Sequence, residues 1–163
     1  MKPFRVGLGY DSHRLEAGRR LVLAGVEIPF EKGLVGHSDA DVLLHAISDA
    51  ICGAAGLPDI GMLFPNTDPR WEGADSTVLL REIVGRAAEA GWLMGNLDAV
   101  LIAERPKIAK YVPKMRELVS ELLQVDTDCV NIRGKTAEAM GALGAGEGME
   151  AHAVCLMYRA PGE

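Results

Sequence analysis

The spacing of apolar residues along this 163-residue chain predicts its strands and helices. Alternation predicts strands over 4–10, 96–103, 130–133 and 150–158, and a hairpin of two short strands over 21–29. Apolar residues three and four positions apart predict helices over roughly 77–90, 112–123 and 137–143, and an earlier one that follows Ser38 and ends near 53–56. Because strands and helices alternate, the pattern indicates an α/β or a mixed α+β fold, and the length suits one domain over 1–163.

Two segments follow neither spacing. Residues 33–36 carry two glycines, and we expect a flexible approach to the first helix. The segment 59–69 is rich in proline, which we expect to exclude both a helix and a central strand. Its polar groups still need partners, so it is either a packed surface loop or one wall of a ligand site.

Composition narrows the classes of partner. The formal net charge is −6, and proteins that bind nucleic acid usually present a basic face, so we expect no nucleic-acid partner. A small phosphorylated ligand stays compatible with this charge, because a few local cations or a metal can reverse the field inside one pocket. Three widely spaced cysteines, no leader-like pattern and no apolar run of membrane-spanning length together predict a cytoplasmic protein with no membrane partner.

Reactive side chains concentrate at the start of the first helix. Ser38 followed by Asp41 has the form of a helix-capping box. Asp41, His45 and Asp49 lie four residues apart, so a helix places them one above another. This carboxylate–imidazole–carboxylate face, with His37 beside it, indicates a site for a cation or a proton.

A possible ligand set for a metal combines this helix with the first strand. Asp11 and His13 are two residues apart, so they point the same way on an extended backbone, at what we expect to be the end of the strand. Two imidazoles and one carboxylate form a three-ligand set that leaves the fourth position of a catalytic zinc open. The alternative is a turn-closing pair with His45 as a packed core histidine, but three of the four histidines fall within 13–45, which favours the metal.

Two glycine motifs have weaker interpretations. Gly7-Leu8-Gly9 lacks the third glycine of a dinucleotide-binding loop. Gly134-Lys135-Thr136, followed by Glu138, resembles the end of a phosphate-binding loop, but that loop needs a glycine where Cys129 stands. An anion site at a helix N-terminus and ordinary capping by Thr136 remain equally good interpretations of this segment.

Several further motifs match one known family nearly end to end. They are Gly-Tyr-Asp-Ser-His-Arg at 9–14, Gly-Val-Glu-Ile-Pro at 25–29, His-Ser-Asp-Ala-Asp-Val-Leu-Leu-His-Ala at 37–46, Asp-Ile-Gly at 59–61, Leu-Phe-Pro-Asn-Thr-Asp-Pro at 63–69, Arg-Pro-Lys at 105–107 and Gly-Glu-Gly at 146–148. With them the chain resembles the 2-C-methyl-D-erythritol 2,4-cyclodiphosphate synthases of the non-mevalonate isoprenoid pathway. The resemblance implies an α+β fold with a mixed four- to five-stranded sheet, helices packed on one face, and a homotrimer with active sites at subunit interfaces.

The resemblance also implies a reaction. The 2-phosphate of 4-diphosphocytidyl-2-C-methyl-D-erythritol 2-phosphate attacks the β-phosphate, which yields 2-C-methyl-D-erythritol 2,4-cyclodiphosphate and releases CMP. A phosphate monoester has a second pKa of about 6, so the attacking group is largely a dianion at neutral pH and needs no strong general base. Positioning and charge neutralisation then carry the reaction.

The family pattern assigns roles to individual residues. It gives a zinc-like ion to Asp11, His13 and His45, and a second divalent ion, magnesium or manganese, to Glu138 at the diphosphate. It makes His37 and Thr136 the transition-state stabilisers. The expected substrate contacts near the methylerythritol and the first metal are Asp11, Ser12, His13, His37, Ser38, Asp49, Asp59, Ile60, Gly61, Phe64, Pro65, Asn66, Thr67 and Asp68. Those at the cytosine are Ala103, Glu104, Arg105, Pro106, Lys107, Ile108 and Ala109, and those at the diphosphate are Lys135, Thr136, Ala137, Glu138, Ala142 and Ala145.

Some positions depart from the family pattern. Ala142 stands where an aromatic residue is frequent and Ala145 where an arginine is frequent, which puts in doubt any isoprenoid diphosphate bound on the threefold axis. Asn66 replaces a frequent aspartate, and Gly134-Lys135 replaces the commoner Ala-Thr. We expect these changes to alter the contacts in the diphosphate pocket and to leave the metal site in place. Asp41 and Asp49, four residues either side of His45, are candidates to orient that histidine or to meet the ligand.

Two other functions are compatible with the same residues. A zinc hydrolase would use metal-activated water to open a nucleotide diphosphate. A non-catalytic trimer would bind an isoprenoid or a nucleotide without turnover.

Overall fold

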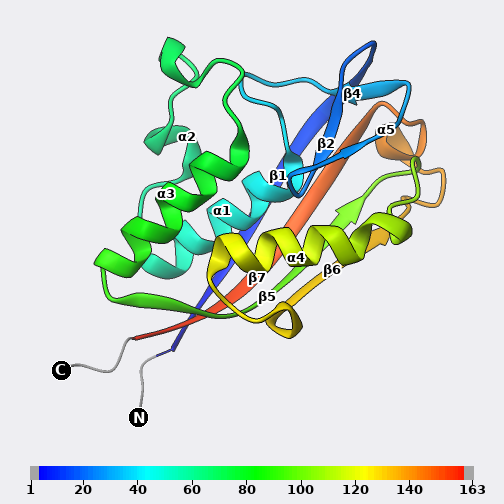
Figure 1. The fold of residues 1–163 in the computed structure, drawn as a ribbon. Helices are drawn as coiled ribbons and strands as arrows, with labels where there is room; N and C mark the ends of the chain where they lie inside the picture. The colour runs from blue at the N-terminus through cyan, green and yellow to red at the C-terminus, as the bar shows by residue number, and fades with distance from the viewer. Residues whose placement is uncertain (1–3, 160–163) are drawn as a thin grey trace.

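A five-stranded mixed sheet forms the framework of the computed structural model, which describes residues 4–159 (Figure 1). The strand order is β4-β1-β7-β5-β6, with β1 at Phe4–Ala17, β4 at Lys32–Leu34, β5 at Trp92–Ile102, β6 at Val130–Lys135 and β7 at Gly148–Arg159. β5 and β6 are parallel, and the other pairs are antiparallel. The predicted α+β fold with a mixed sheet is confirmed.

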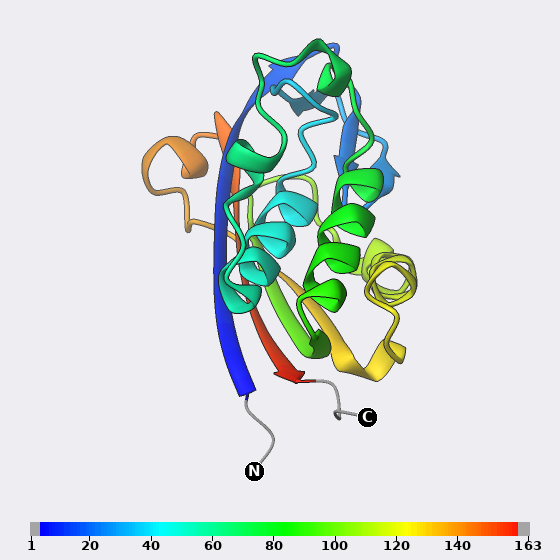
Figure 2. The ribbon, with the colours of Figure 1, turned by 90° about the vertical axis from the view of Figure 1, so that its left-hand side faces the viewer.

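Three long helices cover one face of this sheet (Figure 2). They are α1 at Val42–Ala55, α3 at Ser76–Glu89 and α4 at Val112–Leu123. A separate hairpin joins β2 at Leu21–Leu23 to β3 at Val26–Ile28, and short turns occupy Pro69–Trp71, Ala109–Tyr111 and Thr127–Cys129. The packing of helices on one face therefore follows the prediction.

Helix α1 packs unusually close to β1, and two glycines permit this. A Cβ atom on Gly7 would lie 1.8 Å from the carbonyl oxygen of Ala50, and one on Gly9 would lie 1.8 Å from that of Ala46. Any side chain there would overlap the helix backbone, so Gly7-Leu8-Gly9 serves helix packing and not a dinucleotide. Asp11 follows Gly9 by two positions in β1, so its side chain points to the same face of the sheet as the two glycines, the face that α1 covers.

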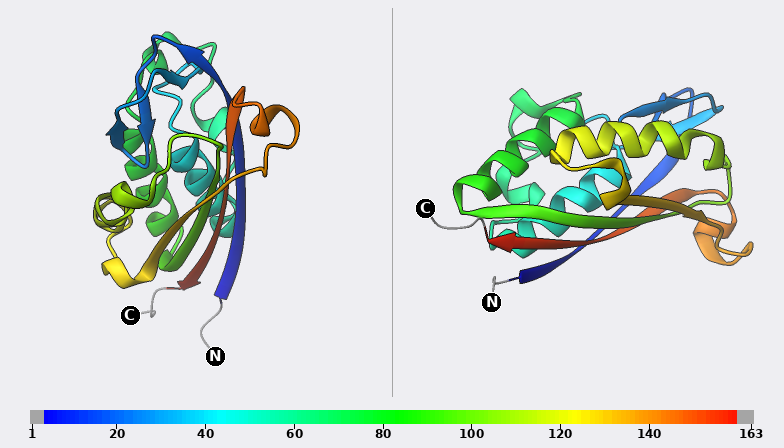
Figure 3. Two further views of the ribbon diagram at one scale, coloured as in Figure 1. Left: turned by 90° about the vertical axis from the view of Figure 1, so that its right-hand side faces the viewer. Right: turned by 60° about the horizontal axis from the view of Figure 1, so that its bottom comes forward.

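The opposite face of the sheet is not covered by any helix of the described residues, 4–159 (Figure 3). Apolar side chains on this face are exposed: Phe4 by 57%, Val6 by 68%, Leu8 by 69%, Tyr10 by 48% and Val154 by 45%. Leu8 pairs with Val154 across β1 and β7, so the residues form a continuous surface, which we call the open apolar face. Figure 3 shows the segment with helix α5, at Gly141–Gly144, protruding on this same side.

Four local expectations were wrong. β1 runs on to Ala17, so Asp11 lies within the strand and not at its end. The proline-rich loop contains a short helix, α2, at Ile60–Leu63, because the Asp59 side chain accepts the Met62 N–H and starts a turn before the prolines. Residues 33–36 are not wholly flexible, since β4 begins at Lys32. The helix expected over 137–143 shrinks to Gly141–Gly144, because Glu138 and Ala139 have left-handed backbones, at φ 52° and 59°.

The cap of α1 also differs from the prediction. Asp41, not Ser38, caps the helix, and its fully buried carboxylate accepts the N–H groups of Leu44, Ala24 and Gly25. Burial raises the pKa of Asp41, although these three N–H groups oppose the rise. This carboxylate ties the β2–β3 turn to α1, so Asp41 neither reaches a ligand nor orients the His45 ring. No helix of the described residues is long and apolar enough to cross a membrane.

Candidate functional site

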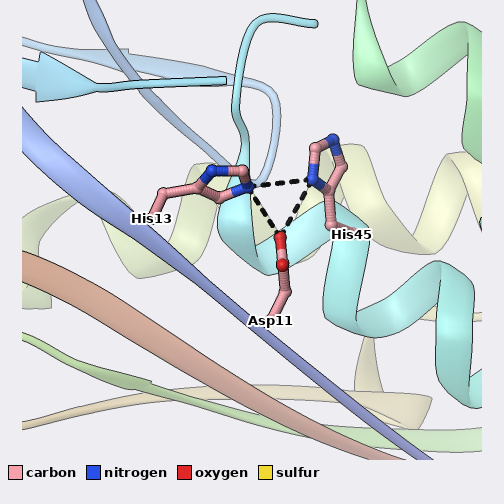
Figure 4. Close-up of side chains that lie close together, drawn as sticks. All are labelled: Asp11, His13 and His45. Atoms are coloured by element: carbon pink, nitrogen blue, oxygen red, sulfur yellow. Dashed lines mark hydrogen bonds and ion pairs between the residues drawn. The ribbon is translucent and has the colours of Figure 1, made fainter. Parts of the chain in front are cut away.

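Asp11, His13 and His45 converge in one place (Figure 4). Asp11 Oδ2 lies 2.8 Å from His13 Nε2 and 3.0 Å from His45 Nδ1, and the two ring nitrogens are 3.2 Å apart. Asp11 and His13 come from β1, and His45 comes from the first turns of α1. Among the residues that the structure describes, this is the one group of three or more such side chains close enough to hold a metal ion.

The triangle of donor atoms fits a metal ion. Ligands about 2.0 to 2.1 Å from a tetrahedral zinc lie about 3.3 Å from one another, close to the three edges observed. The second nitrogen of His13 also favours this use, because Nδ1 lies 2.7 Å from the Val35 carbonyl oxygen and donates its proton there. Nε2 is left with its lone pair toward Asp11 and His45, as a metal ligand requires.

The charges in this group are strongly coupled. Burial alone would raise the pKa of Asp11, but the hydrogen bonds and charges of His13 and His45 outweigh burial and lower the pKa to about 2. Burial would lower the pKa of His13, but Asp11 outweighs it and raises the pKa above its ordinary value of 6.5. Asp11 is therefore ionised at neutral pH, and its negative charge favours a cation at this site.

A cavity of about 230 Å³ opens over the three donor atoms. It gathers most of the residues expected around the first metal, namely Asp11, His13, His37, Ser38, His45, Ile60, Gly61, Phe64 and Asn66. His37 Nε2 donates to the Asp68 carbonyl oxygen at 3.3 Å, which holds the ring against the 64–68 loop.

Other residues expected in this region lie outside the cavity lining. Ser12 is exposed. Because it directly follows Asp11 in β1, its side chain points to the opposite face of the sheet, the open apolar face. Asp49 accepts the Ile60 N–H at 3.0 Å and thereby holds α2, and burial raises its pKa. Asp59, Pro65, Thr67 and Asp68 shape the same loop from outside: Asp59 caps α2, and Asp68 pairs with Arg70.

Four residues of this region were not predicted. Trp71 and Leu79 line the cavity, and Asp39 and Ser76 hydrogen-bond behind His45. Leu79 belongs to the predicted apolar stripe of α3, which gave no sign of a ligand. Asp39 stands inside the motif at 37–46 but had no role of its own in the prediction, and Ser76 was interpreted only as part of the start of a helix.

A second cavity, of about 140 Å³, lies at the carboxyl ends of the parallel strands β5 and β6. It is lined by Leu101, Ala103, Pro106, Lys107, Ile108, Ala109, Gly134, Lys135 and Thr136. Five of the seven residues expected at the cytosine are in this lining, and Glu104 and Arg105 are not. Ligands commonly bind outside the carboxyl ends of parallel strands.

Glu104 turns away from the second cavity to hold the following segment. Its Oε1 accepts the N–H of Ala137 at 2.8 Å and that of Ala139 at 3.3 Å. Thr136 donates its hydroxyl to Glu138 Oε1 at 2.8 Å, so the two side chains form a pair beside the cavity. Neither of the two interpretations of this segment, an anion site at a helix N-terminus or capping of that helix by Thr136, fits the structure, because α5 begins only at Gly141 and its N-cap is Met140.

The remaining expected residues are scattered. Glu138 belongs to no metal-binding group among the described residues, and it is exposed. Ala142 and Ala145 are exposed on the α5 segment, and Ala145 borders a separate cavity of about 350 Å³ with Lys32 and Arg105. Ala142 and Ala145 line neither the metal cavity nor the second cavity in this one subunit, whereas Glu138 lies beside the second cavity through its hydrogen bond with Thr136.

Comparison with known proteins decides the family. The YgbB family matches residues 4–158. This chain belongs to that family. The chain is 57% identical over 153 residues to the 2-C-methyl-D-erythritol 2,4-cyclodiphosphate synthase of Geobacter sulfurreducens, covering 94% of this chain and 98% of that one. It is 53% identical over 159 residues to the same enzyme of Neisseria gonorrhoeae, covering 98% and 99%.

Solved structures agree with this family. A 2C-methyl-D-erythritol-2,4-cyclodiphosphate synthase with bound CDP superposes with a TM-score of 0.87 at 40% identity, over 94% of this chain and 99% of the other. The bifunctional IspDF of Campylobacter jejuni superposes with a TM-score of 0.94 at 36% identity, over 98% of this chain but 43% of that one. The chain thus matches one part of that larger protein.

Proposed function

We propose that this chain catalyses the closure of 4-diphosphocytidyl-2-C-methyl-D-erythritol 2-phosphate to 2-C-methyl-D-erythritol 2,4-cyclodiphosphate, with release of CMP, in the non-mevalonate isoprenoid pathway. One observation carries the proposal: in a chain of this family, Asp11, His13 and His45 converge beneath a cavity that also contains His37 and Ser38. The relative with bound CDP supports a substrate that carries a cytidine diphosphate group.

The three converging donors would hold a zinc-like ion. When bound, such an ion supplies Lewis-acid polarisation of a phosphate oxygen. The work of the chain itself is positioning: His13 keeps its Nδ1 proton on the Val35 carbonyl, and Asp11 keeps its charge. His37 lies in the same cavity, and its Nε2–H, which here meets the Asp68 carbonyl oxygen, would donate to a phosphate oxygen of the bound substrate instead.

The second cavity would take the cytosine, and the Thr136–Glu138 pair beside it would meet the diphosphate. The lining of Pro106, Ile108 and Ala109 is apolar enough to contact a flat base, and Lys107 and Lys135 add positive charge. Glu138 would hold a second divalent ion, magnesium or manganese, with oxygens from the diphosphate completing its shell. Thr136 would stabilise the transition state.

The open apolar face supports assembly as a homotrimer. This face is a continuous apolar surface formed by the exposed side chains of Phe4, Val6, Leu8 and Tyr10. Its exposure to water is unfavourable, and a surface of this kind usually marks an interface. The linings of the metal cavity and the cytosine cavity share no residue. We therefore propose that each active site combines the metal cavity of one subunit with the cytosine cavity of its neighbour.

A phosphorus NMR assay with the cytidyl substrate tests this function. The expected products are the cyclic diphosphate and CMP in equal amounts. A linear bisphosphate would instead indicate hydrolysis by metal-activated water. Tight binding of CDP without turnover would indicate a non-catalytic binding protein. Either of the last two results contradicts the proposal.

A further inference from the structure

The His45 ring is held from both of its nitrogens. Nδ1 faces Asp11 and His13, whereas Nε2 faces two hydroxyl oxygens, Ser76 Oγ at 2.9 Å and Ser38 Oγ at 3.1 Å. If Nδ1 offers its lone pair to a metal, the ring proton resides on Nε2 and must be donated. The question is which hydroxyl accepts it.

Ser76 is the better acceptor, because its own proton is already committed. The Ser76 hydroxyl donates to Asp39 Oδ1, and the Ser76 backbone N–H donates to Asp39 Oδ2 at 3.0 Å. The hydroxyl oxygen therefore presents a lone pair to His45. Ser38 Oγ is farther from His45, and it already accepts the N–H of Ala40 at 3.2 Å.

Asp39 is itself fixed. Its Oδ1 also accepts the N–H of Asp41 at 3.1 Å, and its own backbone N–H donates to the Ala74 carbonyl at 3.0 Å. Asp39 precedes α1 and Ser76 is the first residue of α3, so the two side chains join the starts of both helices behind the metal cavity. Ser76 is 1% exposed, so water does not compete with His45 for its hydroxyl oxygen.

We propose that Ser76, held by Asp39, is a positioning residue for the metal ligand His45. By accepting the Nε2 proton, it fixes the tautomer and the ring orientation, and the Asp39 charge behind it makes Nδ1 a stronger donor. This inference rests on the metal site of the proposed function. Removing such a supporting partner typically weakens metal binding about 10- to 100-fold.

Cobalt binding to the metal-free protein tests the inference. The variant Ser76→Ala is titrated with Co²⁺ against a chromophoric chelator, and the visible absorption of the bound Co²⁺ reports the coordination geometry. Ser76→Thr keeps a hydroxyl and is the rescue variant. Ser120→Ala is the matched control, because Ser120 is also buried and hydrogen-bonded, to the Glu117 carbonyl, but lies in α4. Asp39→Asn keeps the side-chain volume and removes the charge behind Ser76.

In Ser76→Ala we expect the Co²⁺ dissociation constant to increase by about 10- to 100-fold and the absorption spectrum of the bound Co²⁺ to change. In Ser76→Thr and Ser120→Ala we expect near-normal Co²⁺ binding. Asp39→Asn should weaken binding in the same direction, which keeps the test valid if Ser76→Ala does not fold. Unchanged binding in both Ser76→Ala and Asp39→Asn would overturn the inference and leave the metal site in place. A wild-type protein that binds neither Co²⁺ nor Zn²⁺ would instead remove the metal site on which the inference depends.

Discussion

At the scale of single residues, His37 and His45, two of the three histidines that line the metal cavity, have different environments. His45 Nδ1 lies 3.0 Å from Asp11, whereas His37 contacts a backbone carbonyl and is outside the metal-binding group. We expect His45→Ala to lose bound metal and activity while the assembly persists. The matched variant His37→Ala should keep the metal and lower the turnover.

Metal analysis of both purified variants checks this pair, with product formation measured alongside. Full activity of His45→Ala in a metal-depleted preparation would contradict the role assigned to His45. Loss of metal from His37→Ala would place that residue among the ligands.

The pair of Asp11 and His13 also predicts a pH dependence for the metal-free protein. Asp11 has a lowered pKa, so its contribution to the free energy of unfolding is present above pH 3.8 and is lost as the pH falls toward 2. His13 has a raised pKa, so its contribution is present below pH 6.5 and is lost as the pH rises through the folded-state pKa. Both contributions coexist between pH 3.8 and 6.5.

We therefore expect the stability advantage of wild type over His13→Gln to be larger at about pH 5.5 than at about pH 8.5. Urea unfolding of both proteins in the presence of a chelator measures it. An advantage that is equal at the two pH values would show that the Asp11–His13 ion pair does not contribute to folding.

At the scale of elements, the contact of α1 with β1 decides where His45 lies. We expect Gly9→Ala to destabilise the fold by about 3 kcal/mol or to displace α1, because the new methyl group would overlap a backbone carbonyl. Gly85→Ala is the matched control: Gly85 lies in α3, and a methyl group there would meet no other part of the protein within 4 Å, so alanine should stabilise the helix by about 0.5–1 kcal/mol. Thermal unfolding of both variants should give shifts of opposite sign, and equal shifts would contradict the packing argument.

Glu104 links two loops and gives a second prediction at this scale. Its carboxylate holds the left-handed turn that carries Glu138, and a glutamine oxygen could accept the same N–H groups. We expect Glu104→Ala to lower turnover and CDP affinity, and Glu104→Gln to retain most of both. Steady-state kinetics and CDP titration of the two variants measure this. Equal loss in both would mean that the charge of Glu104 matters and not its hydrogen bonds.

The sequence predicted the elements better than their ends. Strand alternation and helical spacing found four of the five strands of the sheet and the three long helices, because burial on one face leaves a regular pattern, but they missed the short strand β4. The ends depended on single side chains: Asp59 starts α2, Asp41 replaces Ser38 as the cap, and Glu104 holds a turn from a distant loop. The first two are capping bonds between residues three positions apart and the third spans 33 positions, but none of them depends on the apolar spacing from which the elements were predicted.

In the candidate site, too, spacing along the chain predicted some residues, and others became apparent only from the fold. Asp11 and His13 were predictable as a pair because residues two apart on a strand point the same way, and the concentration of histidines within 13–45 suggested His45 as the third ligand. Ser76 was not predictable as a partner of His45, because no spacing rule connects two residues 31 positions apart. Asp41 and Asp49 looked equivalent on the helix, and only the fold shows that one ties a turn and the other holds α2.

At the scale of the whole molecule, the open apolar face predicts self-association. We expect Leu8→Asp to dissociate the assembly and to abolish activity while the subunit stays folded, because Leu8 is 69% exposed in the isolated subunit. The control is Val78→Asp, which places the same charge at a 51% exposed site on the outer surface of α3. Light scattering gives the mass of each variant, and circular dichroism checks the fold. A fully active, monomeric Leu8→Asp protein would contradict an active site shared between subunits.

The distance in sequence between the metal ligands has a consequence for folding. Asp11 and His45 are separated by 34 positions, so an unfolded chain does not present them together. An ion held by this set binds the native chain alone, and each tenfold rise of free metal above the dissociation constant adds about 1.4 kcal/mol to the free energy of unfolding. The lifetime of the protein during metal starvation would therefore depend on the same three side chains as its proposed chemistry, so a chelator would act as a denaturant as well as an inhibitor.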